Sequence, residues 1–273
     1  MIRRIFPALF FVIACAASTA GIAQRADDTL HLVQTLPVNA RFAVTDNLGN
    51  IYLINAENAV EKYAPDGRLL TRYSSNRLGS ATMLDVSNPL KVLVWYADFR
   101  TALFLDRSLT ALGELNLITA GYPEVRAIAA SRDGNLWLYD EVNFRLAKVT
   151  PDGEKRFESQ ALNQLGLTPG QVSCILENND RVYMADSTQG LLIFDLFAQF
   201  DRIFTPAWPV TAFQVVDQQI HYVAQDSIVM EHLRVRASRE IALPAVAGNG
   251  AEAILAPRRL LLIRKDAVEI WGY

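Results

Sequence analysis

The chain has 273 residues, of which 51% are hydrophobic and 20% are charged, and its formal net charge is −3. A chain of this length can bury a large core, and the length is ordinary for a single all-β domain. The excess of acidic residues excludes a surface built to hold a phosphate backbone, so we expect no nucleic-acid partner.

The first 23 residues are typical of a secretory signal peptide, because Arg3 and Arg4 precede an apolar run and small residues follow up to Ala23. The run is too short to span a bilayer, and no later segment reaches that length, so the sequence predicts no transmembrane segment. Cleavage after Ala23 leaves 24 basic and 29 acidic residues, a net charge of −5. In the alternative, Cys15 is acylated and anchors a lipoprotein. Both readings predict export to the periplasm or the exterior.

Cleavage also leaves Cys174 as the single cysteine, which excludes an internal disulfide framework. The surrounding stretch "QVSCILE" is typical of a strand. We therefore expect an inert thiol within the core, with pairing to a partner protein as the alternative.

A four-step pattern recurs six times after residue 37. Each unit has an apolar strand A, a polar turn, an apolar strand B, a short loop, an amphipathic strand C and an outer strand D. The B strands align as "NIYLINAEN", "KVLVWYADF", "NLWLYDEVN", "RVYMADSTQ", "QIHYVAQDS" and "LLLIRKDAV". Their spacing of about 40 to 46 residues is the interval of four-stranded propeller blades.

The last unit stops at Tyr273 after three strands, and a spare strand, "TLHLVQTLP", lies at residues 29–37. Pairing the two would complete a sixth blade and remove an exposed edge. The sequence thus predicts an all-β, six-bladed β-propeller closed by the N-terminal strand, as one domain over 24–273. The expected blades are about 38–74, 75–118, 119–164, 165–205, 206–244, and 245–273 plus 29–37.

The stretch "YDEVNFRLAKVTPDG" resembles the NHL-type repeat, with Asp140, Asn143 and Arg145 followed by a strand that ends in the turn 151–153. "INAENAVEKYAPDG" matches in part and the other four units match weakly. The resemblance implies an NHL-like six-bladed propeller. The phrase "NPLKVLVWYADFRTALFLDRSL" is similar to uncharacterised envelope propellers of Bacteroidota, a resemblance that implies no known activity.

Aspartates recur at the loop between strands B and C, namely Asp98, Asp140, Asp186, Asp226 and Asp266. A ring of carboxylates could bind a cation. Because the recurrence follows the repeat, we instead expect these side chains to accept backbone N–H bonds in their own turns. Aromatic residues of the B strands, such as Trp95 and Trp137, are expected to fill the space between blades, with stacking on a sugar or peptide as the alternative.

The residues that enter the A strands should face the central channel, where propeller enzymes such as sugar-lactone hydrolases hold a metal. Here they are Arg41, Thr82, Arg126, Ser173, Thr211 and Glu252, with Glu124 and Gln171 nearby. This set makes a poor cage for a divalent cation, so we predict no metal and no other cofactor. Glu124 and Glu252 are the acids to test. His31, His221 and His232 lie on different strands without the spacing of zinc ligands.

The connections from strand D to the next strand A are longer and less regular than the hairpin turns, and they should gather on one face. They carry apolar and aromatic residues beside two arginines: Leu78, Tyr122, Pro123, Leu167, Trp208 and Pro209, with Arg77 and Arg126. Exposed aromatic residues in loops are typical binding anchors. The predicted partner-binding residues are therefore Trp208, Tyr122, Arg126, Leu167 and Arg77.

Two functions from different classes fit these observations. The first is a non-enzymatic binding module or scaffold of the bacterial cell envelope that recognises a protein partner through one propeller face. The alternative is a metal-dependent hydrolase or lyase, lactonase-like, that acts on a lactone, glycan or peptide at the channel. The incoherent set of residues at the channel favours the first, and a glycan or peptide ligand stays open.

Overall fold

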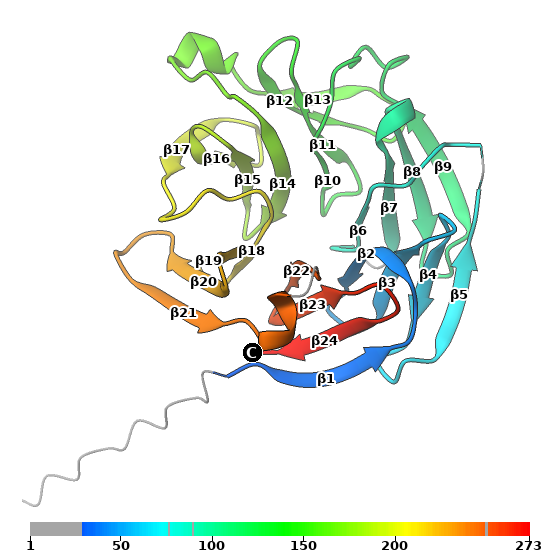
Figure 1. Cartoon of the computed structure of the whole chain (residues 1–273). Coiled ribbons are helices and arrows are strands. Elements are labelled where there is room, and N and C mark those ends of the chain that lie inside the picture. The colour runs from blue at the N-terminus through cyan, green and yellow to red at the C-terminus, as the bar shows by residue number, and fades with distance from the viewer. Residues whose placement is uncertain (1–28, 76, 89, 249–250) are drawn as a thin grey trace, which may run out of the picture.

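The computed structural model describes residues 29–75, 77–88, 90–248 and 251–273. These residues form six antiparallel four-stranded sheets arranged in a ring, a six-bladed β-propeller (Figure 1). The predicted fold class is confirmed. The predicted signal peptide and Cys15 lie outside the described residues. Among the described residues, no helix has the length and apolar character needed to cross a membrane.

Each of the first five blades takes its strands in chain order from the channel outward. Blade 1 holds β2 (Ala40–Thr45), β3 (Ile51–Asn55), β4 (Val60–Tyr63) and β5 (Leu69–Tyr73), and blade 2 holds β6 (Met83–Asp85), β7 (Lys91–Tyr96), β8 (Thr101–Asp106) and β9 (Ala111–Asn116). Blade 3 holds β10 (Ile128–Ala130), β11 (Leu136–Asp140), β12 (Arg145–Val149) and β13 (Lys155–Glu158).

Blade 4 holds β14 (Val172–Asn178), β15 (Arg181–Asp186), β16 (Gly190–Asp195) and β17 (Phe200–Phe204), and blade 5 holds β18 (Phe213–Val216), β19 (Gln219–Ala224), β20 (Ser227–His232) and β21 (Ser238–Ala242). Blade 6 holds β22 (Glu252–Ala256), β23 (Arg259–Ile263), β24 (Val268–Gly272) and, as its outer strand, β1 (His31–Leu36). Three short 3-10 helices are η1 (Ala97–Phe99), η2 (Leu162–Leu165) and η3 (Ala245–Gly248).

Strand β1 closes the ring, which confirms the closure by an N-terminal strand that the sequence predicts. It pairs antiparallel with β24 from His31 opposite Gly272 to Leu36 opposite Val268. Leu36 is buried in a cluster with Ile270 of blade 6 and Ile51 of blade 1. The first and last strands of the described chain thus share one sheet, and the pairing covers the edge that β24 would otherwise expose.

The core lies in the seams between blades because the B strands are apolar on both faces. Alternate residues of β11 face opposite neighbours: Leu136 and Leu138 pack toward blade 2, whereas Trp137 and Tyr139 pack toward blade 4. Trp95 and Trp137 are both buried, which confirms that they fill the seams. Cys174 in β14 is half-buried, and burial raises the pKa of its thiol to about 12, so the thiol stays protonated at neutral pH.

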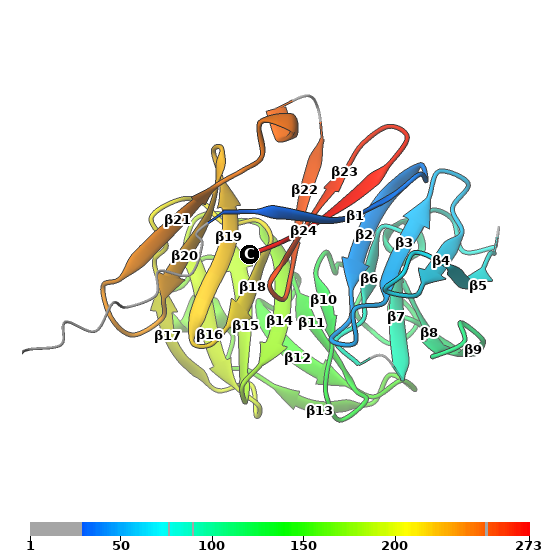
Figure 2. The same cartoon turned by 90° about the horizontal axis from the view of Figure 1, so that it is seen from below.

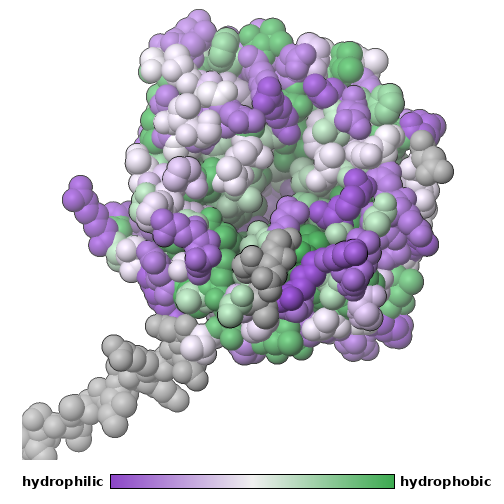
Figure 3. Space-filling view, viewed as in Figure 1, coloured by the Kyte–Doolittle hydropathy of each residue, from purple (hydrophilic) through white to green (hydrophobic). Residues whose placement is uncertain are grey.

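The two faces of the propeller differ in the connections that they carry. The D–A loops between blades and the B–C turns share one end, here named the loop face, which is turned to the viewer in Figure 1 and lies uppermost in Figure 2. The A–B and C–D turns share the opposite end, here named the hairpin face. The channel opens as a hollow at the centre of the loop face in the space-filling view (Figure 3).

Candidate functional site on the loop face

Backbone and side-chain hydrogen bonds tie the D–A loops of the loop face to the neighbouring B–C turns. Nδ2 of Asn58, in the B–C turn of blade 1, donates to the Gly79 oxygen at 2.7 Å, and Oδ1 of Asn58 accepts from the Ala81 N–H at 2.8 Å. Between blades 2 and 3, the Leu117 N–H donates to the Arg100 oxygen at 2.8 Å. Such bonds satisfy loop backbone groups away from any sheet and hold the loops in place. The loop face is therefore a preorganised platform.

Two of the recurring aspartates accept backbone N–H hydrogen bonds within their own B–C turns, as the repeat predicts. Oδ1 of Asp140 accepts from the N–H groups of Val142 and Asn143 at 3.0 and 3.2 Å. Oδ1 of Asp186 likewise accepts from the backbone of Thr188 and Gln189. This confirms the structural role for Asp140 and Asp186.

Three further aspartates of the expected ring do not share this role. Asp98, Asp226 and Asp266 accept no backbone bond of this kind from the residues that the structure describes. The prediction that every recurring aspartate supports its own turn is wrong at these three positions, because only the turns of blades 3 and 4 place two consecutive N–H groups at the carboxylate.

The predicted partner-binding residues come from four successive D–A loops and do not form one compact patch. Trp208, in the loop between blades 4 and 5, is 40% exposed. Leu167 is half-buried against the cluster between blades 3 and 4. Arg77 is bound bidentately by Glu114, at 3.0 and 2.6 Å, and Arg126 pairs with Glu141 at 3.2 Å. Among the described residues, no hydrogen bond or ion pair joins any two of the five.

Tyr122 is the main correction to the predicted set. It is only 9% exposed and packs in the cluster between blades 2 and 3 with Leu117 and Val125. Leu78 of the neighbouring loop is also buried. Each of the two side chains points into the seam beneath its own D–A loop, because each loop folds back over the gap between two blades. The expectation of an exposed Tyr122 anchor is therefore wrong.

Five apolar side chains that the sequence analysis did not single out are exposed on this face instead. They come from two B–C turns and two D–A loops, and their exposed fractions lie between 39% and 54% except for Phe144 at 37%: Phe99, Ile118, Val142, Phe144 and Leu165. We name these five the apolar arc. Their loops are bonded in sequence around blades 2 to 4, from Arg100 to Leu117 and from Phe144 to Leu162. For Phe99 and Phe144, the signal that could have found them is an aromatic residue within a turn motif, as in "ADFRT" and "EVNFR".

Phe144 has a left-handed backbone with φ of 54°. The B–C turns of four other blades also contain a left-handed residue, with φ of 68° at Asn58, 49° at Arg100, 90° at Gly190 and 53° at Gln225, and Phe144 is the aromatic one among them. Asparagine and glycine tolerate this region, whereas a bulky aromatic residue costs about 1 kcal/mol or more there. Strain at an exposed aromatic residue is an observation that supports a functional role for it.

Trp208 stands on a well-supported segment. The Ala207 N–H donates to Oε1 of Glu231 at 2.9 Å, and the hydroxyl of Tyr222 donates to the same oxygen and accepts from the Trp208 N–H at 3.4 Å. Tyr222 is fully buried, and its pKa is raised by burial and by the hydrogen bond to Glu231. The Trp208 backbone is thus fixed from below while its ring is exposed.

The residues at the channel entry lie where the repeat places them, and all six predicted positions are exposed: Arg41, Thr82, Arg126, Ser173, Thr211 and Glu252. Arg41 donates to Oδ1 of Asn58 at 2.7 Å. Glu124 lies 3.7 Å from Arg100, a pairing that directs its carboxylate toward a cation of the protein. Glu124 precedes blade 3 and Glu252 begins blade 6, so the two acids lie on opposite sides of the ring.

No group of three or more histidine, cysteine, aspartate or glutamate side chains suited to a metal ion occurs in the described part of the chain. His31 lies on outer strand β1, and His232 ends β20 and accepts from the Arg234 N–H at 3.1 Å. His221 is buried in β19, its Nδ1 lies 3.2 Å from the Tyr273 hydroxyl, and burial lowers its pKa to about 4. The three histidines lie on three different strands, and although β19 and β20 are neighbours in blade 5, His221 and His232 belong to no group of metal-binding side chains among the described residues.

Comparison with known proteins gives structural neighbours only. No protein-family model matches the sequence, and no curated protein matches it. Virginiamycin B lyase from Staphylococcus aureus superposes with a TM-score of 0.62 and 12% identity, over 89% of this chain and 99% of that chain. A streptogramin B lyase gives 0.62 and 11%, over 89% and 97%. The β-propeller domain of Cps50 (Swd1) from Myceliophteria thermophila gives 0.61 and 9%, over 89% and 99%. These likenesses show the fold alone.

Proposed function

We propose that the protein is a non-enzymatic binding module or scaffold of the bacterial cell envelope that recognises a protein partner through the loop face. The observation that carries the proposal is the set of exposed apolar side chains on loops that hydrogen bonds hold fixed. Trp208 and the apolar arc supply anchors, and their backbones need no reordering on binding.

The charged residues around these anchors suit the rim of an interface. Arg77 and Arg126 are more than half exposed and each is already paired with a glutamate. Paired surface arginines contribute little to affinity, because their glutamate partners compete with the incoming protein. They can still set the orientation of the partner and its association rate. We therefore assign binding energy to Trp208, Phe144 and their apolar neighbours, and steering to Arg77 and Arg126.

Leu167 and Tyr122 have a supporting place in this proposal. Leu167 is half-buried beside Leu165 of η2, so it can contact a partner only along one edge. Tyr122 holds the loop that carries Ile118. Its contribution to binding is therefore indirect, through the position of that loop.

Export to the envelope is proposed from the first 23 residues of the sequence. Arginine residues ahead of an apolar run and small residues before a cleavage point remain the support for it. Resemblance of one repeat to NHL-type propellers supports a binding role further, as does a neighbour that is a β-propeller domain without an enzyme name.

The alternative, a metal-dependent hydrolase or lyase at the channel, takes its support from the two lyases among the structural neighbours. The residues at the channel entry argue against this alternative. The six predicted positions include two arginines, Arg41 and Arg126, and one carboxylate, Glu252, which is a poor ligand set for a divalent cation. A divalent cation that co-purifies and is lost in both Glu124→Ala and Glu252→Ala variants would favour this alternative over the binding module.

Site-specific photocrosslinking in the native envelope tests the proposal. A benzophenone amino acid placed at Phe144 or Trp208 should capture one and the same protein, and the purified partner should then bind the wild-type propeller in solution. The matched controls are Leu48 and Leu90, equally apolar and 68% exposed on the hairpin face. Capture of that partner from the control positions, and not from Phe144 or Trp208, would contradict the proposal.

A further inference from the structure

Three residues paired across neighbouring strands of blade 6 leave an open space on the hairpin face, beside the strand β1 that closes the ring. Gly272 of β24 pairs with His31 of β1 on one side and with Arg259 of β23 on the other. Directly paired residues of neighbouring strands point to the same face of the sheet. A β-carbon on Gly272 would lie 2.7 Å from Cε1 of His31 and 3.2 Å from Nη1 of Arg259. Glycine thus allows the imidazole and the guanidinium to approach each other.

Arg259 has no hydrogen-bond or ion-pair partner among the described residues, unlike the cations at the same place in other blades. Lys91, the first residue of β7, donates to the Gly134 oxygen in the next A–B turn at 2.8 Å. Arg181, the first residue of β15, lies 4.0 Å from Asp201. Each of these residues begins a B strand and faces the following blade. The seam between blades 6 and 1 is the one of these three where the cation is left uncompensated.

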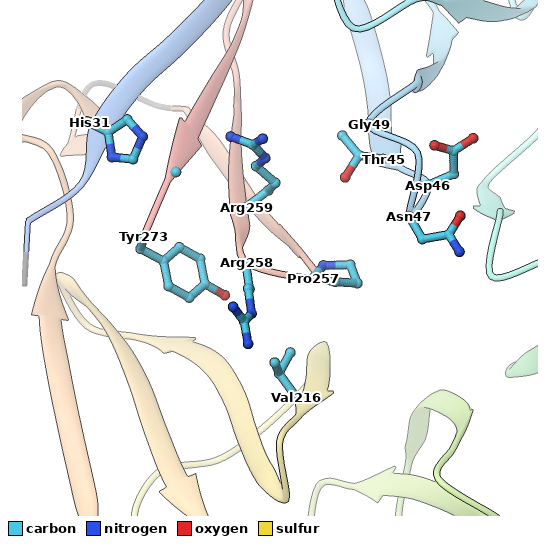
Figure 4. Close-up of a pocket in the computed structure, with 11 residues that line it drawn as sticks. His31, Thr45, Asp46, Asn47, Gly49, Val216, Pro257, Arg258, Arg259 and Tyr273 are labelled. Atoms are coloured by element: carbon cyan, nitrogen blue, oxygen red, sulfur yellow. The ribbon is translucent and has the colours of Figure 1, made fainter. Parts of the chain in front are cut away.

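The acidic and basic neighbours of Arg259 are already engaged. Oδ1 of Asp46 accepts from the N–H groups of Leu48 and Asn50, both at 2.9 Å, and its Oδ2 accepts from Asn50 Nδ2 at 2.8 Å. Arg258 forms an ion pair with Asp217 at 2.6 Å. Figure 4 shows Arg258 and the Asp46 carboxylate turned away from Arg259, whose guanidinium rises between His31 and the turn of Thr45 and Gly49.

A cavity of about 500 Å³ surrounds this group. Blade 6, the closing strand β1, and the A–B turns of blades 1 and 5 line it, with Pro257 and Val216 as apolar walls. That volume falls in the range of small-molecule sites, which combine apolar walls with a few convergent polar groups. A half-buried guanidinium without an ion-pair partner favours an anionic ligand, because its planar fork matches the oxygens of a carboxylate or phosphate.

We propose that this cavity binds the oxyanion of a small organic ligand, a carboxylate or a phosphate, with Arg259 as the anchor and His31 as a second donor. The site goes beyond the proposed partner binding, because it lies on the opposite face of the propeller. It also spans the strand pairing that closes the ring. An occupied cavity would therefore join β1 to blade 1 and stabilise the closure.

Titration with succinate and with inorganic phosphate, followed by backbone amide NMR, tests the site. Saturable shifts of the Gly49 and Gly272 amides are expected with at least one of the two anions, and the tighter of the two identifies the ligand group. Sodium chloride at matched ionic strength should leave both amides in place. Arg259→Gln should weaken the binding by about tenfold or more, the loss expected for one charge-assisted hydrogen bond.

Arg181→Gln is the matched control, because Arg181 holds the equivalent position at another seam of the same face. It should leave the titration unchanged, and thermal unfolding of both variants should match the wild type. Equal weakening by Arg259→Gln and Arg181→Gln would show diffuse electrostatic attraction and overturn the proposal. The absence of saturable shifts with both anions would overturn it as well.

Discussion

The loop face and the hairpin face of the propeller solve different problems with the same strands. On the hairpin face, buried polar side chains pin one blade to the next: Glu177 of blade 4 accepts from Ser131 Oγ and Trp137 Nε1 of blade 3, both at 2.5 Å. On the loop face, the connections between blades are longer and expose Phe99, Phe144 and Trp208. Further hydrogen bonds on the hairpin face join one blade to the next, such as Lys62 to the Arg107 oxygen and Lys91 to the Gly134 oxygen. The hydrogen bonds of the loop face instead hold the D–A loops against the B–C turns, and the apolar side chains of that face stay exposed.

The largest expected effect on stability concerns the closure of the ring by β1. Deleting residues 24–37 removes β1, exposes the edge of β24 and uncovers the cluster around Ile270. We expect the loss of a single cooperative unfolding transition in calorimetry. The control is a deletion of residues 24–28, which leaves β1 intact and should unfold like the full chain. A β1 deletion that melts like the full chain would rule out the closure.

Tyr122 sharpens the contrast within the loop face, because it is buried whereas Trp208 is exposed. Tyr122→Ala should destabilise the protein by about 3 to 5 kcal/mol, as for other buried aromatic side chains. Trp208→Ala should cost less than about 1 kcal/mol in the same denaturant titration. Equal effects of the two substitutions on the free energy of unfolding would show that the assignment of core and surface is mistaken.

Glu177 tests the pinning role of the hairpin face. Glu177→Ala removes the acceptor for three donors, including the Arg132 N–H at 3.1 Å, and leaves the buried indole N–H of Trp137 without a partner. The expected loss of stability is about 2 to 4 kcal/mol. Glu114→Ala, which breaks the exposed pair with Arg77, is the control and should cost about 1 kcal/mol at most. Similar losses from both would remove the distinction between the two faces.

The buried imidazole of His221, at the seam between blades 5 and 6, should make the free energy of unfolding depend on pH. Burial lowers the pKa of its imidazole from the usual 6.5 to about 4. Between these values the unfolded chain binds a proton that the folded chain does not, so stability falls as the pH drops from 6.5 toward 4, by up to about 3 kcal/mol. Urea titrations at several pH values should show this slope, and His221→Gln should flatten it. An unchanged slope in the variant would assign the effect to other groups.

The arrangement of the strands could be predicted from the sequence because it follows from local rules. Alternation and turn residues locate the B strands, and the missing fourth strand of the last unit, set against residues 29–37, predicts the closure. The role of Asp140 follows equally from its own turn. These features depend on residues close together in the chain, which is why one unit suffices to recognise them.

The exposure of loop residues could not be predicted in the same way, since it depends on the neighbouring blade. Tyr122 and Trp208 both look like loop aromatics in the sequence, yet the loop of Tyr122 folds into a seam. Phe144 takes the left-handed position of its B–C turn, where the other blades have residues as different as Asn58, Arg100, Gly190 and Gln225, so no residue type marks this position in the sequence. The pairing of His31 with Gly272 and Arg259 brings together residues from both ends of the described chain, so no local pattern reveals it.

Titration calorimetry with the captured partner shows whether the loop face supplies the binding energy. The double variant Phe144→Ala with Trp208→Ala should lose about 2 to 4 kcal/mol of binding free energy while it unfolds like the wild type. The matched double variant Leu48→Ala with Leu90→Ala, on the hairpin face, should bind within about 0.5 kcal/mol of the wild type. Undiminished binding by the first variant together with weakened binding by the second would contradict the account.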